Sequence, residues 1–219
     1  MSDPAEYAAW YGTSRGAWIG HTEAALLREM LALQSQESLL DVGCGTGYFT
    51  TRLARSTSAQ VIGLDPNRDW LRFAKAHSSA RFAWVAGRGE ALPFPAASFD
   101  CTVSVTALCF MADPARALAE IVRVTRRRFA LGLLNRRSLL WRQKGRDGGV
   151  GAYQGAHWHT LGEVRRLIAS SRVAHPSIRT AVFLPGGGGL ARVAERLVPS
   201  RLPVGAFLAV VGDLRHEGE

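Results

Sequence analysis

Hydrophobic and polar positions follow two different periods along this chain of 219 residues. Short apolar runs predict buried β-strands, and longer segments with one apolar face predict helices. The runs expected as strands cover residues 37–43, 59–65, 80–87, 98–105, 128–134, 177–185 and 204–214. The segments expected as helices cover residues 18–33, 47–56, 67–77, 114–125, 160–170 and 189–198. Asn67 is a typical N-cap residue, and Pro114 occupies the favoured first position of its helix.

The order of these segments predicts an α/β fold. Strands that alternate with helices require right-handed crossovers, which produce a parallel sheet with helices on both faces. The last two strands are separated by a loop and one short helix, so the final strand can return beside its neighbour. We therefore expect a Rossmann-like, doubly wound, mostly parallel seven-stranded sheet with an antiparallel C-terminal edge strand.

Composition favours one soluble domain. A hydrophobic content of 47% over 219 residues is enough for one full core and too little for two comfortable ones. The first residues, MSDPAEYAAWYG, lack the basic and apolar parts of a signal peptide. The longest apolar run, 202–211, is about half of what spans a bilayer, so we expect a cytoplasmic protein. The three cysteines form no CxxC pair, which favours buried thiols over a disulfide framework or a metal site.

The charge distribution leaves several kinds of partner open. The formal net charge is +9, and many of the basic residues gather in one short segment. They are Arg123, Arg126, Arg127, Arg128, Arg136, Arg137, Arg142, Lys144 and Arg146. Such a cluster can bind nucleic acid, an acidic substrate or an anionic membrane surface, or it can form a solvated face.

The segment LLDVGCGTGYFTTRL, residues 39–53, carries the strongest local signal. Its glycines follow an apolar strand with the spacing Gly43-x-Gly45-x-Gly47, which lets a backbone approach a ligand closely. A dinucleotide fingerprint requires glycine where this chain has Tyr48, and no Gly-Lys-Ser/Thr follows for a phosphate-binding P-loop. The turn therefore permits close approach without the features that hold phosphate.

Asp65 ends the second expected strand, 22 residues after Gly43. The carboxyl ends of neighbouring strands meet at the switch point of a doubly wound sheet, so Asp65 is expected to face the glycine turn. A carboxylate there can accept hydrogen bonds from both hydroxyls of a ribose. The two features together indicate a nucleoside ligand rather than a phosphate ligand.

Four segments of the chain, taken in order, resemble one family. LLDVGCGTG, VIGLD, GEALPFPAASFD and EIVRVTRR are similar to the class I S-adenosylmethionine-dependent methyltransferases, in the small-molecule branch with an LPF motif, type 11-like. The resemblance implies one methyltransferase domain over residues 1–219, with N-terminal cap helices (1–36), a cofactor-binding core (37–134) and a substrate-lid and C-terminal hairpin region (135–219). It also implies S-adenosylmethionine as cofactor and S-adenosylhomocysteine as product.

The resemblance assigns cofactor contacts to individual residues. Asp41, Gly43, Gly45 and Gly47 would line the methionine and ribose portion, and Asp65 would bind the ribose hydroxyls. Further contacts are implied at the adenine, at the sulfonium and in the N-terminal segment that covers the cofactor. They are Pro66, the Trp70 region, Gly89, Glu90, Thr106 and Tyr7.

Arg88 departs from the pattern of that family. Its members commonly have an acidic residue there, whose side chain accepts a hydrogen bond from the adenine amino group. An arginine side chain carries donors only. Either Glu90, a backbone carbonyl or apolar contacts would have to replace that interaction.

Candidates for catalysis and acceptor binding lie outside the glycine turn. Methyl transfer from an activated donor needs alignment and exclusion of water, and a base only where the nucleophile must lose a proton. The candidate catalytic residues are His157, His159 and Tyr11. Residues expected to contact the acceptor are Leu108, Asn135, Arg136, Tyr153 and Trp158. For each of these residues the alternative is a structural role, which is core packing, helix capping, loop anchoring or solvation.

The leading hypothesis is methyl transfer to a small-molecule acceptor by in-line displacement at carbon. The arginine-rich segment favours RNA or another macromolecule as the alternative acceptor. Against this alternative, the chain has SVTALCF where an amino-methylating tetrad of the N/D-PP-Y/F type would lie. A non-catalytic S-adenosylmethionine-binding protein is the alternative from a different class. The acceptor atom and the oligomeric state stay open, and neither a metal nor a membrane span is expected.

Overall fold

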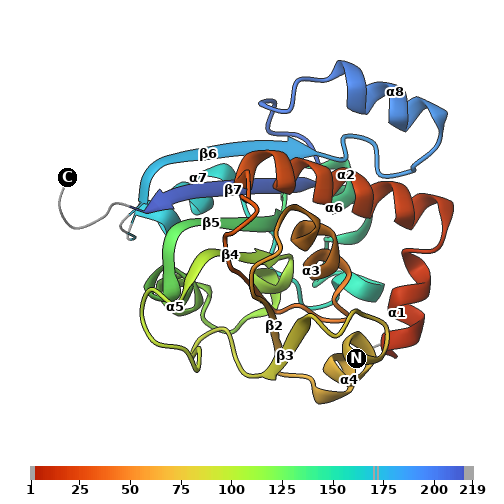
Figure 1. Cartoon of the computed structure of the whole chain (residues 1–219). Coiled ribbons are helices and arrows are strands. Elements are labelled where there is room, and N and C mark those ends of the chain that lie inside the picture. The colour runs from red at the N-terminus through yellow and green to blue at the C-terminus, as the bar shows by residue number, and fades with distance from the viewer. Residues whose placement is uncertain (1–2, 170, 172, 215–219) are drawn as a thin grey trace.

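A seven-stranded sheet forms the centre of the computed structural model, which describes residues 3–169, 171 and 173–214. The strands are β1 (Leu39–Val42), β2 (Val61–Asp65), β3 (Phe82–Ala86), β4 (Phe99–Val105), β5 (Thr125–Leu134), β6 (Val173–Ala181) and β7 (Phe207–Leu214). Their order across the sheet is β3-β2-β1-β4-β5-β7-β6 (Figure 1). Neighbours among β1 to β5 pair in parallel, and β7 is antiparallel to both β5 and β6.

This sheet confirms the predicted doubly wound, mostly parallel architecture with an antiparallel C-terminal strand. That strand is β7, and it lies one place inside the edge because β6 pairs along its outer side. The first six residues of β7 are all buried, whereas most of the described positions of β6 are partly or fully exposed. The more apolar run therefore takes the interior place, and the strand that tolerates solvent forms the edge.

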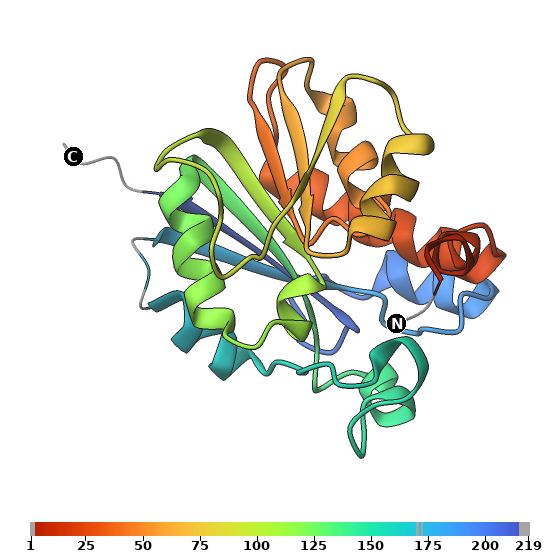
Figure 2. The ribbon, with the colours of Figure 1, turned by 90° about the horizontal axis from the view of Figure 1, so that it is seen from below.

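Helices cover both faces of the sheet, with α5 and α7 on one face and α2 and α3 on the other (Figure 2). The α-helices are α1 (Pro4–Trp10), α2 (Ser14–Leu31), α3 (Tyr48–Leu53), α4 (Arg68–Ala76), α5 (Pro114–Val124), α6 (Leu139–Lys144), α7 (Leu161–Ala169) and α8 (Gly189–Leu197). The short 3-10 turns are η1 (Ala54–Ser56), η2 (Ala107–Phe110) and η3 (Gly151–Tyr153). The pattern of the sequence does not predict α6, η2 or η3, because each is too short to show a period.

Side-chain caps begin two of the predicted helices. The Asn67 Oδ1 atom accepts hydrogen bonds from the backbone N–H groups of Asp69 (3.0 Å) and Trp70 (3.4 Å) at the start of α4. Asp113 accepts from the N–H of Arg116 at 2.9 Å, and Pro114 is the first residue of α5. These contacts satisfy donors that a helix start otherwise leaves unpaired, and they confirm the predicted starts of both helices.

The fold brings four chain segments to one edge of the sheet. β1, β2, β4 and β5 all end at this carboxyl edge, so the residues that directly follow them lie along one line. Figure 1 shows α1, α6 and α8 on the same side of the molecule. Apolar side chains such as Phe129 and Phe207 fill the interior of the sheet behind that edge. The carboxyl edge is therefore the place where a ligand can meet several strands at once.

Three further properties of the described residues bear on function. Cys44, Cys101 and Cys109 are buried free thiols, as the sequence analysis expects. No helix in the described part of the chain is long and apolar enough to cross a membrane. Among residues 3–169, 171 and 173–214, no group of three or more His, Cys, Asp or Glu side chains could hold a metal ion.

Candidate functional site

The glycine turn after β1 has a backbone that only glycine adopts easily. Gly43, Gly45 and Gly47 have φ angles of 77°, 54° and 78°, in the left-handed region. A Cβ atom on Gly43 would lie 2.2 Å from the Cβ of Ala107. The turn between β1 and α3 therefore depends on its glycines both for conformation and for space.

Asp65 closes the other side of this turn, at the end of β2. Its Oδ2 accepts a hydrogen bond from the Gly45 N–H at 2.9 Å, and its Oδ1 accepts from the Asn67 N–H at 2.8 Å. The acid thus faces the glycine turn across the strand ends. Each carboxylate oxygen keeps a free lone pair. Burial raises the pKa of Asp65, and the two backbone donors lower it, so the two effects oppose each other.

Asp41 lies beneath the same turn and is only 1% exposed. The hydroxyl of Thr50 donates to its Oδ2 at 2.6 Å, while its Oδ1 has no hydrogen-bond partner among the described residues. Burial raises the pKa of Asp41 to about 7, partly offset by the Thr50 hydrogen bond. A buried acceptor without a donor is costly, so Oδ1 is a position where a cationic or N–H donor would be stabilised.

Aromatic side chains from α1 lie against the glycine-turn region. The rings of Tyr7 and Trp70 have centroids 4.9 Å apart, and the Tyr11 ring stacks on Tyr48 at 3.5 Å. The hydroxyl groups of Tyr7 and Tyr11 are 3.2 Å apart. The charge of Asp65 is one of the causes that raise the pKa of Tyr7, after the larger effect of burial. Helix α1 therefore places Tyr7 against Trp70 and within electrostatic reach of Asp65.

The segment after β3 approaches the glycine turn from the opposite side. A Cβ atom added to Gly89 would lie 2.7 Å from the Cε and 2.9 Å from the Sδ of Met111. A Cβ atom added to Gly43 would lie 3.8 Å from the same Met111 Cε. The exposed guanidinium of Arg88 lies 3.5 Å from the Glu90 carboxylate. Met111 thus sits between two of the predicted cofactor residues, and Arg88 pairs with a third. Pro66, also predicted to contact the cofactor, is exposed after β2.

The end of β4 is a strained turn. Thr106 has a φ angle of 58°, unusual for a β-branched residue, and its N–H donates to the Gly132 carbonyl of β5 at 2.8 Å. Such strain persists where the surrounding structure fixes it, and it is frequent at functional sites. Leu108, two residues further, is 1% exposed and belongs to the hydrophobic core.

Residues 153–159, which we call the lid segment, run along η2 and the end of β5. The N–H of His157 donates to the Cys109 carbonyl at 2.7 Å, and the N–H of His159 donates to the Leu134 carbonyl at 2.8 Å. The imidazole rings of His157 and His159 are 4.5 Å apart, and the Trp158 ring between them in sequence packs against Tyr153 at 5.4 Å.

The two histidines of the lid segment have different surroundings. His159 is buried, its Nε2 has no partner among the described residues, and burial lowers its pKa to about 4, so its imidazole is neutral at physiological pH. His157 is exposed.

Burial raises the pKa of Tyr153 to about 12, and it raises the pKa of Tyr11 well above its usual value, so both phenols stay protonated.

Asn135 has a structural role in this geometry. Its Nδ2 donates to the carbonyls of Pro203 (3.0 Å) and Gly205 (2.7 Å), and its Oδ1 accepts from the Arg137 N–H at 2.9 Å. The side chain is 1% exposed and its polar atoms are engaged within the protein. Asn135 therefore fixes the turn after β5 from which Arg136 projects.

Comparison with known proteins identifies this arrangement. Residues 40–129 match the sequence profile of the family described as a methyltransferase domain. An uncharacterized protein of Mycobacterium tuberculosis is 34% identical over 98% of this chain and 74% of its own length. The chain belongs to the class I S-adenosylmethionine-dependent methyltransferases. Its cofactor is S-adenosylmethionine.

Other relatives of the methyltransferase extend the comparison. A malonyl-[acyl-carrier protein] O-methyltransferase of Serratia marcescens is 37% identical over 52% of this chain and 46% of its own length. A solved S-adenosylmethionine-dependent methyltransferase of Thermotoga maritima, described as a possible histamine N-methyltransferase, has a TM-score of 0.74. It is 24% identical and the alignment covers 96% of both chains, so the likeness shows the fold.

The residues of the methyltransferase fit a sulfonium nucleoside. The unpaired Oδ1 of Asp41 is suited to the ammonium group of the methionine portion, and the free lone pairs of Asp65 are suited to the ribose hydroxyls. The glycine turn provides the close backbone approach between these two acids. The site therefore presents acceptors where the cofactor carries donors.

Sequence reasoning missed two residues of this region. Met111 could not be found from its spacing, because it reaches the glycine turn from η2 through tertiary packing. Glu23 lies on α2, whose polar and apolar pattern resembles that of any amphipathic helix. Its charge is among the causes that raise the pKa values of Tyr7, Tyr11 and Tyr153. The electrostatic effect of this carboxyl group on the phenols arises only once the helices are assembled.

Proposed function

We propose that this methyltransferase methylates a small-molecule acceptor by in-line displacement. The observation that carries the proposal is a cavity of about 590 Å³ that adjoins the lid segment at the carboxyl edge. Its volume lies in the range typical of sites that bind small molecules. Residues 37–134 would hold the cofactor, while residues 1–36 and 135–219 would cover it and surround the acceptor.

The proposed cofactor contacts follow from the geometry of the edge. Asp41 would accept from the methionine ammonium group, Asp65 would accept from the ribose hydroxyls, and Tyr7 would cover the nucleoside from α1. The remaining predicted contacts lie on the turns after β1, β2, β3 and β4. They are Gly43, Gly45, Gly47, Pro66, Gly89, Glu90 and Thr106. Glu90 stays the candidate for the adenine edge, because the neighbouring Arg88 offers donors only and already lies beside the Glu90 carboxylate.

S-adenosylmethionine supplies a methyl group already activated by the positive sulfur, so the protein's contribution is alignment and exclusion of water. The lid segment would exclude water above η2, since its His157 N–H is anchored on the Cys109 carbonyl. Tyr153 and Trp158 would shape the acceptor side of that lid, as the sequence predicts, whereas Leu108 would act through core packing. Asn135 would act as a positioning residue for Arg136.

A proton acceptor is needed only where the acceptor atom of the substrate carries a proton that it does not lose easily. His157 and His159 remain candidates, with the neutral Nε2 of His159 available as an acceptor. Tyr11 is protonated and would serve as a hydrogen-bond donor. Glu23 is an additional candidate, because burial raises its pKa to about 8, near the pH at which a general base works efficiently.

Methyl transfer to RNA is the alternative that the arginine-rich segment favours. Four of its arginines are engaged elsewhere: Arg123 lies 2.6 Å from Glu120, Arg126 lies 3.1 Å from Asp100, and Arg127 and Arg128 both pair with Glu37. Because of these ion pairs, fewer unpaired arginines are available to bind the phosphate backbone of an RNA than the sequence alone indicates.

The test is an acceptor screen in which formation of S-adenosylhomocysteine is measured by mass spectrometry. The panel contains small alcohols, amines, carboxylic acids, phosphate esters and thiols, with total RNA as the macromolecular arm. We expect product with at least one small-molecule class and loss of that product in Asp65→Ala. Turnover with RNA alone would favour the alternative. S-adenosylhomocysteine binding without turnover on any arm would favour a non-catalytic role.

A further inference from the structure

A basic cavity lies beside the lid segment, where β5 ends. Its lining comes from the turn after β5, from α6 and the loop that follows, and from the lid segment. The lining residues are Arg136, Trp141, Gly145, Arg146, Asp147, Gly148, Ala156, His157 and Trp158. The cavity has a volume of about 590 Å³ and is widely open to solvent. We call it the α6 cavity.

Within the described part of the chain, the cations of the α6 cavity have no acidic partner. Among the described residues, neither Arg136 nor Arg146 makes an ion pair or a side-chain hydrogen bond, and both guanidinium groups lie 5.7 Å from the Trp141 ring. The two arginines thus flank one indole, which contributes a cation–π attraction to each. Their hydrogen-bonding groups stay available, and all of these groups are donors.

A buried donor independently points to a ligand. Trp158 is 4% exposed and lines the cavity, and its indole N–H has no acceptor among the described residues. A buried N–H without a partner costs free energy comparable to a lost hydrogen bond. An oxygen atom placed in the cavity could remove that cost. His157, on the same wall, adds a polar ring.

The loop that lines the α6 cavity has a defined shape. The N–H of Val150 donates to the Lys144 carbonyl at 3.0 Å, and the N–H of Gly155 donates to the Gly148 carbonyl at 2.8 Å. A Cβ on Gly145 would lie 2.3 Å from Trp141 and 2.7 Å from Trp158, so glycine is what lets both indoles approach. Backbone hydrogen bonds and the packing of both indoles on Gly145 therefore fix this wall of the cavity.

We propose that the α6 cavity binds a carboxylate or phosphate group of the acceptor substrate, with Arg136 and Arg146 as its charged donors and Trp158 as a neutral donor. The inference rests on the proposed small-molecule function and names its substrate class as anionic. Asp147 is the one carboxylate among the lining residues, so donors and positive charge dominate the wall. An anionic oxygen is the chemistry that matches such a wall.

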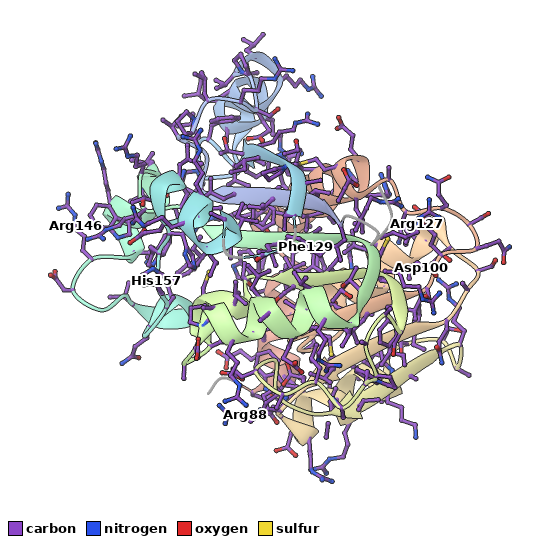
Figure 3. All side chains as sticks on the ribbon, turned by 90° about the vertical axis from the view of Figure 1, so that its left-hand side faces the viewer. Arg88, Asp100, Arg127, Phe129, Arg146 and His157 are labelled. Carbon is purple, nitrogen blue, oxygen red and sulfur yellow. The ribbon has the colours of Figure 1, made fainter. Side chains whose placement is uncertain are left out.

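The position of the cavity suits an anchor for the acceptor. Its wall residue His157 is hydrogen-bonded to Cys109, and the Cys109 N–H donates to the Thr106 carbonyl at 3.1 Å at the end of β4. The anion would thus be held beside the proposed transfer site and outside the glycine turn. Figure 3 shows Arg146 and His157 at one end of the sheet and Arg127 and Asp100 at the other. Unpaired arginines concentrated in one cavity favour a small anion over a nucleic-acid backbone.

The test is isothermal titration calorimetry of the full chain saturated with S-adenosylhomocysteine. The titrants are inorganic phosphate, succinate and a single-stranded RNA oligonucleotide. The variants are Arg136→Gln, Arg146→Gln and, as a charge-matched control, Arg165→Gln, whose side chain is exposed on α7. S-adenosylhomocysteine affinity is measured first for every protein and reports that each variant is folded.

We expect phosphate or succinate to bind, with each cavity variant weakening that binding by about tenfold and the control leaving it unchanged. The anion that binds more tightly identifies the phosphate or carboxylate class. Equal anion affinity in all variants, or no anion binding while S-adenosylhomocysteine binds normally, would overturn the inference and leave the cofactor assignment intact. RNA that binds more tightly than both anions and weakens with the same variants would also overturn it. Absence of S-adenosylhomocysteine binding in the unsubstituted chain would contradict the proposed function itself.

Discussion

The two ends of the central sheet use the same residue type for opposite purposes. At the amino end, where β5 begins, Arg126, Arg127 and Arg128 all pair with acidic residues. At the carboxyl end, where β5 has finished, the basic residues make no ion pair among the described residues. They are Arg136, Arg137, Arg142, Lys144 and Arg146. Figure 3 shows Arg127 and Asp100 at the amino end and Arg146 at the carboxyl end.

The difference teaches that the surroundings of a cation decide its role. Glu37 is buried just before β1 and forms ion pairs with Arg127 and Arg128, so these two arginines compensate a charge that the fold has removed from water. Among the residues that the structure describes, no such acid lines the α6 cavity, so its arginines keep their donors free. Changes at the amino end should therefore alter stability, and changes at the carboxyl end should alter binding.

The largest effect is expected for Arg128→Ala at the amino end. The substitution leaves the buried Glu37 carboxylate with the largely exposed Arg127 as its remaining cation, and it removes the hydrogen bond from Arg128 to the Leu31 carbonyl. Removal of one partner from a buried pair costs about 3–5 kcal/mol. Urea unfolding measures the loss. Arg137→Ala is the control, with less than about 0.5 kcal/mol expected at an exposed position. An equal loss in the two variants would break the comparison.

Asp65→Ala should have the next largest effect, which we expect on cofactor binding. We expect S-adenosylhomocysteine affinity to fall by about tenfold or more, because charge-assisted hydrogen bonds to the ribose are lost. Titration calorimetry measures the affinity. Asp69→Ala, in an exposed pair with Arg72 on α4, is the matched control and should change little. Affinity of Asp65→Ala within about twofold of the original would refute the ribose assignment.

Glu23→Gln should separate stability from activity at the carboxyl end. The pKa of Glu23 is about 8 in the folded protein against an ordinary 4.5, so the folded state keeps a proton that the unfolded state has lost. The free energy of unfolding therefore contains a contribution that falls as pH rises from about 4.5 to 8. Glutamine removes this contribution, and the variant should gain stability at pH 8, on the order of 1 kcal/mol, and little at pH 5.

Urea unfolding at pH 5 and pH 8 measures that gain. If Glu23 also removes a proton from the acceptor substrate, Glu23→Gln lowers the turnover rate, and that rate no longer rises with pH. The variant then gains stability and loses activity. An unchanged rate–pH profile would leave Glu23 a structural residue. An unchanged stability difference between the two pH values would contradict its raised pKa.

Arg126→Gln is expected to have the smallest effect. Arg126 is half exposed in its pair with Asp100, and such surface pairs contribute about 0.2–1 kcal/mol. Asp100 also accepts from the N–H and the hydroxyl of Ser38, so it stays satisfied without the arginine. Thermal unfolding in low and high salt measures the loss, which should shrink as salt is added. A loss as large as that of Arg128→Ala would show that burial does not decide these energies.

Much of the fold could be predicted because its signals are local. The apolar runs of the strands, the Asn67 cap and Pro114 act on residues within a few positions, and the structure places elements there. The Asp65 position followed from a general rule about where parallel strands end, and its hydrogen bond to Gly45 agrees with that rule. The α6 helix and the turns η2 and η3 could not be predicted, because they are held by contacts outside their own sequence.

The site was predictable only in part, for the same physical reason. Arg128 and Glu37 are 91 residues apart in the chain, so no window of sequence distinguishes this paired arginine from the free Arg146. The charge of Glu23 likewise acts on tyrosines from α1, α3 and the lid segment. The role of a charge depends on desolvation and on partners, and both are properties of the assembled molecule.

The sequence by itself determined the order of strands and helices, the glycine turn and the acid that faces it, because periodicity and backbone freedom are encoded residue by residue. Only the tertiary structure decided which arginines are neutralised, which donors remain free and which carboxyl group is buried. Those outcomes depend on distances between residues far apart in the chain, and folding alone sets these distances.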